Sequence, residues 1–266
     1  MSIPGSETIA MDDSASRADL SPALEDYLEA IGNILQTQKV ARVKEIAERL
    51  GVRMASVTPA LKRLHKLGFV RYQAREFVEL TEEGERTARR VRTRHELITR
   101  FLIEVLGVSE AKARVDACAA EHVFSNETID RLVRWFEALE RGGLASLKAG
   151  RIPRDCPAVN PELDPAACPC PAGRTLEARR AKGGDLVANL APGEAGEVVQ
   201  IHGDADVRQR LIDGGVLPGT ALSVVRREIE GGPLVVRLGE EEMSLSGDEA
   251  KSIVVSRPNR KRARRA

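Results

Sequence analysis

The segment from residue 43 to residue 80 constrains the fold of this chain most, because two helical patterns are followed there by two strand-like runs. Val43–Leu50 and Met54–Leu67 each repeat apolar residues at the spacing of one helix face. Gly51 and Val52 separate the two segments and predict a tight turn, so a helix-turn-helix is expected. A glycine also follows the second segment, where helices commonly end with a left-handed residue.

Two short strands are predicted directly after this helix-turn-helix. Phe69–Tyr72 and Phe77–Leu80 are rich in β-branched and aromatic residues, and the polar residues 73–76 join them. A helix-turn-helix followed by a hairpin is a winged helix, whose recognition helix enters the major groove of DNA. We therefore expect a winged helix-turn-helix domain over residues 21–90. Its candidate DNA contacts are polar or cationic residues of the recognition helix and the wing: Arg53, Ser56, Thr58, Lys62 and Arg75.

Charge is distributed unevenly along the chain, although the formal net charge is only +1. Residues 39–95 contain fifteen Lys and Arg against seven Asp and Glu, and residues 257–266 form a basic tail. A basic domain and a basic tail beside an acidic remainder indicate a polyanionic partner such as double-stranded DNA. A solvated helix surface without a ligand is the alternative explanation of the same pattern.

Helices are predicted on both sides of the wing. Ser21-Pro22 begins the first helix, and Thr81 begins a long one. Two more helices are predicted, from Ser109 to about Phe124 and from Ser125 onward. Their apolar surface suits a helical dimerisation domain over residues 91–141, since two-fold operators are bound by two-fold proteins.

The last part of the chain changes to short β-type runs. Residues 142–185 are rich in Pro, Ala, Gly and Arg and are predicted to be a linker. Residues 186–256 alternate strand-like runs with Gly/Pro turns and one helix, which is typical of a small β-barrel. The expected fold class is therefore mainly α with a small β part. We expect residues 1–20 to be a disordered leader.

Three metal-ligating residue types recur at helical spacing on the predicted helix that ends near residue 124. Cys118, Glu121 and His122 stand at i, i+3 and i+4, so their side chains would project from one helix face. A thiolate, a carboxylate and an imidazole suit a transition-metal ion if other elements supply further ligands. The candidates for such ligands on other helices are Asp26, Glu29 and His95.

Each of these residues also has a purely structural explanation. Cys118 could be a small core residue, and Glu121 with His122 could be a pair on the helix surface. Asp26 and Glu29 could be acidic residues of a first helical turn that favour the helix dipole. The spacing alone leaves these alternatives open.

Several motifs follow one another in the order found in a known family. They are LEDYLEAIGNIL, RVKEIAERLGVRMASVTPALKRLHKLGFV, LTEEGE, RHELITRFLIEVLGV and CAAEHVFSNETIDRL. From about residue 20 to 256 the chain resembles the metal-dependent transcriptional repressors of the diphtheria toxin repressor and manganese transport regulator family. The stretch LAPGEAGEVVQIHGD with RLIDGGVLPGT resembles the FeoA-like barrel that many members append.

The resemblance implies a function and a set of site residues. It implies a homodimeric, Fe²⁺- or Mn²⁺-dependent regulator that binds palindromic operator DNA and represses metal-uptake or metal-homeostasis genes. It makes residues 91–141 a metal-binding as well as a dimerisation domain, and residues 186–256 a FeoA-like β-barrel. By this resemblance the metal ligands are Asp26, Glu29, His95, Cys118, Glu121 and His122.

The chain departs from both branches of that family. Manganese-type members usually carry Asp and Glu at the positions of Asp26 and Cys118, whereas iron-type members carry Met and Cys. Thr99 stands where iron-type members have a Glu ligand, which leaves a second metal site in doubt. Because a soft thiolate disfavours Mn²⁺ relative to Fe²⁺, we expect Fe²⁺ to be preferred.

Other classes of protein fit less well. A metal-binding interaction module, whose winged helix serves protein contacts, is the competing hypothesis, but the basic charge of residues 39–95 favours DNA. We expect no enzyme and no small-molecule substrate, because the four histidines have no nucleophile motif beside them. No apolar run approaches the ~20 residues that span a bilayer. Without a secretory signal or a disulfide framework, the expected compartment is the cytoplasm.

Three further cysteines lie in the predicted linker, at Cys156, Cys168 and Cys170. With a fourth ligand they could hold zinc or an iron–sulfur cluster, or they could have no metal-binding role.

Overall fold

The computed structural model describes residues 20–72, 77–139, 184–227, 229 and 232–256 of the 266-residue chain. These residues fall into two compact units, Met1–Ala88 and Arg89–Ala266. Several predicted features lie outside the described residues: nearly all of the leader, most of the linker with Cys156, Cys168 and Cys170, the wing residue Arg75, and the basic tail.

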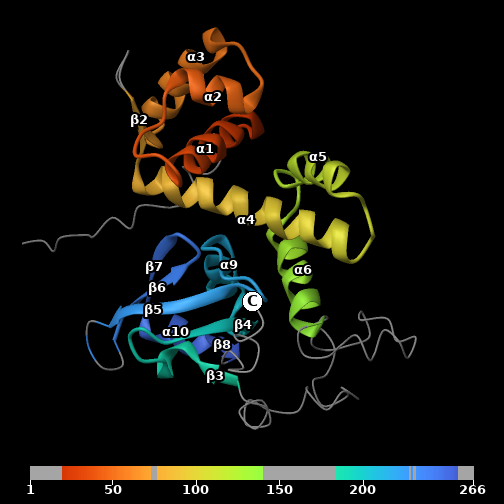
Figure 1. Cartoon of the computed structure of the whole chain (residues 1–266), viewed down its shortest axis with the longest axis vertical. Helices are drawn as coiled ribbons and strands as arrows, with labels where there is room; N and C mark the ends of the chain where they lie inside the picture. The colour runs from red at the N-terminus through yellow and green to blue at the C-terminus, as the bar shows by residue number, and fades with distance from the viewer. Residues whose placement is uncertain (1–19, 73–76, 140–183, 228, 230–231, 257–266) are drawn as a thin grey trace, which may run out of the picture. The chain divides into compact units, whose positions relative to one another are not determined.

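The N-terminal unit is a winged helix, as predicted. Its elements are α1 (Pro22–Leu35), α2 (Val43–Leu50), α3 (Met54–Lys66), β1 (Val70–Tyr72), β2 (Val78–Leu80) and the start of α4 (Glu82–Glu104) (Figure 1). Pro22 begins α1, where its missing N–H breaks no helical hydrogen bond. Gly51 ends α2 at φ 64°, the left-handed conformation that glycine adopts without steric cost. The two strands pair antiparallel, with Val70 opposite Leu80.

The core of this unit is built from one face of each helix and from both strands. Leu28, Ile46 and Leu61 are fully buried, one from each of the first three helices. His65 Nδ1 lies 3.0 Å from the carbonyl oxygen of Val70, and this contact joins the end of α3 to β1. With its apolar face in the core, α3 exposes its polar face.

Three helices form the first part of the C-terminal unit. Most of α4 belongs to it, followed by α5 (Glu110–Ala120) and α6 (Asn126–Ala138). The predicted extension of α5 to about Phe124 is wrong, because the helix ends at Ala120 and a turn follows. Ser125 begins α6 as predicted, and its side chain accepts a hydrogen bond from the backbone N–H of Thr128 at 3.2 Å.

A six-stranded antiparallel sheet, here called the C-terminal sheet, forms the second part of this unit (Figure 1). Its strands are β3 (Gly184–Leu186), β4 (Ala195–Ile201), β5 (Ala221–Arg227), β6 (Leu234–Leu238), β7 (Glu241–Leu245) and β8 (Ile253–Ser256), in the spatial order β3-β8-β4-β5-β6-β7. The short helices are η6 (Val187–Asn189), α9 (Ala205–Asp213) and α10 (Gly247–Ser252). Among the described residues no pairing joins β3 to β7, so closure into a barrel is not shown.

The two edge strands of this sheet, β3 and β7, are not indicated by the sequence pattern. β3 begins at Gly184, inside the segment of residues 142–185 that is expected to be a linker. β7 reads Glu-Glu-Met-Ser-Leu, in which only Leu245 is buried, so it lacks the apolar run that identified the other strands.

The helices and the sheet of the C-terminal unit share one hydrophobic core. Ile129, Val133 and Phe136 of α6 are fully buried in the same cluster as Ile201 and Leu211 of the sheet and α9. In Figure 1, α6 lies beside β4 and α9, and both elements contact it. The helical part and the sheet are therefore packed together as one body.

None of the helices that the structure describes is both long enough and apolar enough to cross a membrane.

Candidate metal centre and DNA interface

The C-terminal unit brings three of the predicted ligands together. His95 Nδ1 of α4 lies 2.7 Å from Glu121 Oε2, and His122 Nε2 lies 3.4 Å from Glu121 Oε1. Glu121 is the residue directly after α5, and His122 follows it in the turn. One carboxylate thus lies between two imidazole rings that come from two different elements.

Burial distinguishes this cluster from an ordinary surface pair. The Glu121 side chain is 0% exposed, and those of His95 and His122 are 19% and 7% exposed. An ionised carboxylate is costly to bury unless hydrogen bonds or a cation compensate it. The alternative of Glu121 and His122 as an exposed helix-surface pair is therefore wrong.

The donor atoms fit a first-row divalent ion. A neutral His95 that donates its Nδ1–H to Glu121 keeps the lone pair of Nε2 available for a metal. Imidazole nitrogen and carboxylate oxygen are both ligands of Fe²⁺, Mn²⁺ and Zn²⁺. The residues present thus have the chemistry that a metal centre requires.

Cys118 lies in the last turn of α5, and its side chain is exposed. The alternative that it is a small core residue is therefore wrong. Cys118, Glu121 and His122 do not share one helix face as predicted, because Glu121 and His122 lie beyond the end of the helix.

Asp26 and Glu29 lie one turn apart on α1 of the N-terminal unit, and both are half-buried. They do not belong to the first turn of α1, whose acidic residue is Glu25. The helix-dipole explanation therefore does not apply to them. Thr99, one turn after His95 on α4, is buried at 8% exposure.

The polar face of α3 is exposed as a DNA-reading helix requires. Arg53 at the N-cap, Ser56 and Lys62 are exposed, and Thr58 is half-buried. On the opposite face Val57 is fully buried. No acidic residue occurs in α3, so the face that could meet phosphate carries only neutral and cationic groups.

Family models match three consecutive parts of the chain. Residues 19–78 match the N-terminal DNA-binding domain of iron dependent repressors, and residues 81–141 match their metal-binding and dimerisation domain. Residues 186–257 match the FeoA domain. The model for metal binding and dimerisation thus covers the elements that hold His95, Glu121 and His122.

Individual relatives give the same result for the first half of the chain. An uncharacterized HTH-type transcriptional regulator of Methanocaldococcus jannaschii is 35% identical over 119 residues, which are 44% of this chain and 95% of that protein. The HTH-type transcriptional regulator MntR of Bacillus subtilis is 38% identical over 120 residues, 44% of this chain and 84% of that protein. The transcriptional regulator MntR of Salmonella typhimurium is 43% identical over 107 residues, 40% of this chain and 68% of that protein.

Proposed function

The chain belongs to the iron-dependent repressor family of metal-dependent, DNA-binding transcriptional regulators, and we propose that it binds operator DNA as a homodimer when loaded with Fe²⁺ or Mn²⁺. The observation that carries this proposal is the buried cluster of His95, Glu121 and His122. It lies in the segment that the metal-binding and dimerisation model matches. A buried carboxylate between two imidazoles has the donors of a metal centre.

The proposed ligand set is larger than this cluster. The family resemblance adds Asp26, Glu29 and Cys118, which come from α1 and from the last turn of α5. A bound divalent cation supplies positive charge that holds carboxylate and imidazole donors in one arrangement. If metal binds the DNA-competent arrangement better, metal binding and DNA binding would reinforce each other by linkage, with a coupling of ~1–3 kcal/mol.

We favour Fe²⁺ as the physiological ion because of Cys118. A thiolate is a soft ligand and disfavours Mn²⁺, whereas Asp26 is the residue that manganese-type members carry. The exposed position of Cys118 keeps its sulfur accessible for ligation.

Repression of metal-related genes would follow from metal-dependent operator binding. A regulator that binds its operator only when metal is plentiful is suited to repress genes of metal uptake or metal homeostasis. Arg53, Ser56, Thr58 and Lys62 of α3 are the proposed contacts to the operator, and Arg75 of the wing is the proposed contact to phosphate or the minor groove. The alternative of a protein-binding winged helix is not favoured, since residues 19–78 match a DNA-binding domain.

An operator-binding assay with parallel metals tests the proposal. Full-length protein is stripped with a chelator and titrated onto a labelled palindromic site from its own promoter, with Fe²⁺ under anaerobic conditions, Mn²⁺, Zn²⁺ or no metal. We expect Fe²⁺ or Mn²⁺ to tighten binding at least several-fold. His122→Ala should abolish this response.

His202→Ala provides a matched control, because His202 follows β4 of the C-terminal sheet and is not part of the His95–Glu121–His122 cluster. It should retain the metal response of the unaltered protein. Operator binding of equal strength with and without every metal would overturn the proposed function.

A further inference from the structure

Arg94 is a buried cation that makes three hydrogen bonds to the segment that follows α5. The residue is 9% exposed. Its Nη1 donates to the carbonyl oxygen of Phe124 at 3.1 Å and, less closely, to that of Glu121 at 3.5 Å. Its Nη2 donates to Asn126 Oδ1 at 2.5 Å. One guanidinium thus binds the turn that carries Glu121 and His122 at its first residue, Glu121, at its last, Phe124, and at Asn126, which begins α6.

The backbone of this turn needs such a partner. The N–H groups of Val123 and Phe124 both donate to the carbonyl oxygen of Ala120, at 3.1 Å each, and so close the end of α5. The last carbonyl groups of a helix have no partner within the helix, and buried carbonyl groups require one. Arg94 provides it for Glu121 and Phe124, and its positive charge is also favourable at the negative end of the helix dipole.

Two neighbouring residues of α4 therefore hold the turn in different ways. Successive residues on a helix point about 100° apart. His95 reaches the Glu121 carboxylate at 2.7 Å, while Arg94 reaches the backbone behind it. Contacts with α4 thus hold both the side chain of Glu121 and the main chain that carries it.

The chemistry of arginine suits this task. Its planar group offers five N–H donors in a fixed geometry, so it can bind several acceptors at once. A cation near a metal centre would repel the metal ion. Here two carbonyl oxygens and an amide oxygen accept hydrogen bonds from the guanidinium, and their partial negative charges act against that repulsion.

We infer that Arg94 is the positioning residue of the metal centre: it sets the backbone of residues 121–125 so that Glu121 and His122 meet His95. The inference rests on the proposed function, because it presumes that this cluster binds a divalent ion. Arg94 itself contributes no ligand atom. Loss of the side chain should weaken metal binding without removing a donor.

Direct metal titration of Arg94→Met and Arg94→Lys tests the inference. Mn²⁺ affinity is measured on the full chain by calorimetry, and Co²⁺ is added separately as a spectroscopic probe of ligand geometry. We expect Arg94→Met to bind Mn²⁺ about 10- to 100-fold more weakly, which is the usual loss when a group that orients metal ligands is removed. Its Co²⁺ absorption bands should shift in position or intensity, whereas Arg94→Lys, which keeps the charge and some donors, should lie between.

Arg131→Met is the matched control, since Arg131 lies on α6 in an exposed pair with Glu127. It should keep both the affinity and the spectrum. Urea unfolding of the metal-free proteins, followed by the fluorescence of Trp135, separates a loss of stability from a loss of ligand geometry. If Arg94→Met does not fold, Asn126→Ala removes one of the three acceptors and should give a smaller loss in the same direction.

The outcomes separate this inference from the proposed function. No Mn²⁺ or Fe²⁺ binding by the unaltered protein would overturn both. Normal binding by the unaltered protein, with unchanged affinity and an unchanged Co²⁺ spectrum in Arg94→Met, would overturn the positioning role alone.

Discussion

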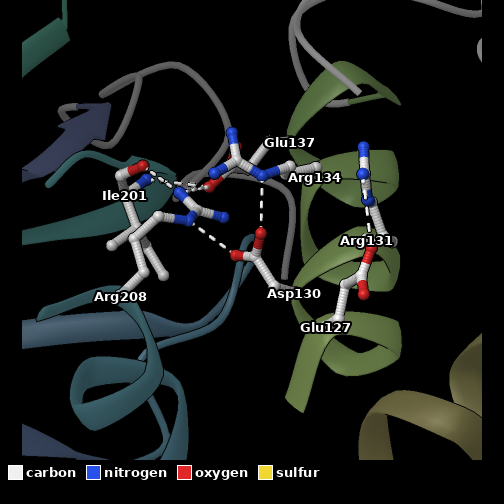
Figure 2. Close-up of polar contacts among 7 residues, drawn as sticks. All are labelled: Glu127, Asp130, Arg131, Arg134, Glu137, Ile201 and Arg208. Carbon is white, nitrogen blue, oxygen red and sulfur yellow. Dashed lines mark hydrogen bonds and ion pairs between the residues drawn. The ribbon is translucent and has the colours of Figure 1, made fainter. Parts of the chain in front are cut away.

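Arg208 of α9 and Glu137 of α6 form a buried ion pair, with 3.0 Å between Arg208 Nη1 and Glu137 Oε1. The same carboxylate oxygen accepts the backbone N–H of Ile201 at 3.0 Å. Asp130, two turns earlier on α6, binds Arg208 Nε at 2.6 Å and Arg134 Nε at 2.6 Å (Figure 2). The C-terminal sheet and α6 are thus joined by charge as well as by apolar packing.

The electrostatics of this junction keep the arginine charged. Burial lowers the pKa of Arg208, but attraction to Glu137 and Asp130 outweighs it, so the pKa lies above its ordinary value. A buried pair of this kind adds little net stability compared with apolar residues of similar size. The pair does, however, disfavour any packing of α6 that leaves one of these buried charges without its partner. It therefore favours one arrangement of α6 against the sheet and α9.

The first prediction concerns the removal of this arginine. Arg208→Met should lower the free energy of unfolding by about 3–5 kcal/mol, because Glu137 is left buried without its cation. Urea unfolding followed by the fluorescence of Trp135 on α6 measures this change. Arg131→Met, which removes an exposed pair, should cost at most about 1 kcal/mol. Equal losses in both variants would contradict the role given to the buried pair.

The second prediction concerns whether the two parts of the C-terminal unit stay together after the chain is cleaved between α6 and the C-terminal sheet. With a protease site inserted between residues 139 and 184, the two fragments should remain associated after cleavage. The reason is the shared core and a second contact, in which Arg89 and Arg92 of α4 bind Glu241 of β7. Gel filtration of the cleaved protein checks this. Separate elution of the C-terminal fragment, which contains the C-terminal sheet, would show that the junction is weak.

The third prediction concerns metal selectivity at Cys118. Cys118→Glu replaces a soft donor by a hard one and should raise the affinity for Mn²⁺ relative to Fe²⁺. Cys118→Ser removes the thiolate without adding a carboxylate and should weaken Fe²⁺ binding. Parallel anaerobic titrations with the two ions measure the ratio. If Cys118→Ser leaves both affinities unchanged, Cys118 is not a ligand.

The fourth prediction concerns the recognition helix. Lys62→Ala should weaken operator binding and reduce the slope of log affinity against log salt concentration by about 1, as expected when one phosphate contact is lost. Fluorescence anisotropy at several salt concentrations measures both quantities. Lys251→Ala, on α10, removes an exposed lysine of the other unit and should change neither. A Lys62→Ala variant with the slope of the unaltered protein would exclude a phosphate contact by Lys62.

Local sequence determined the winged helix. Apolar residues at helical spacing define α2 and α3, and Gly51 adopts the left-handed conformation that its position after α2 requires. The strands of the wing follow from β-branched and aromatic residues next to a turn. These signals lie within a few residues of one another, so they can be read from the sequence without knowing which distant segments pack together.

The tertiary structure decided what the local pattern left open. His95 and Glu121 are 26 residues apart, and only the packing of α4 against the turn after α5 brings them to 2.7 Å. The same packing buries Glu121 and gives Arg94 its acceptors, neither of which the i, i+3, i+4 spacing could reveal. Arg208 meets carboxylates 71 and 78 residues away. Ligand types and helix positions are local properties of the sequence, whereas burial and pairing of charges depend on which distant segments share a core.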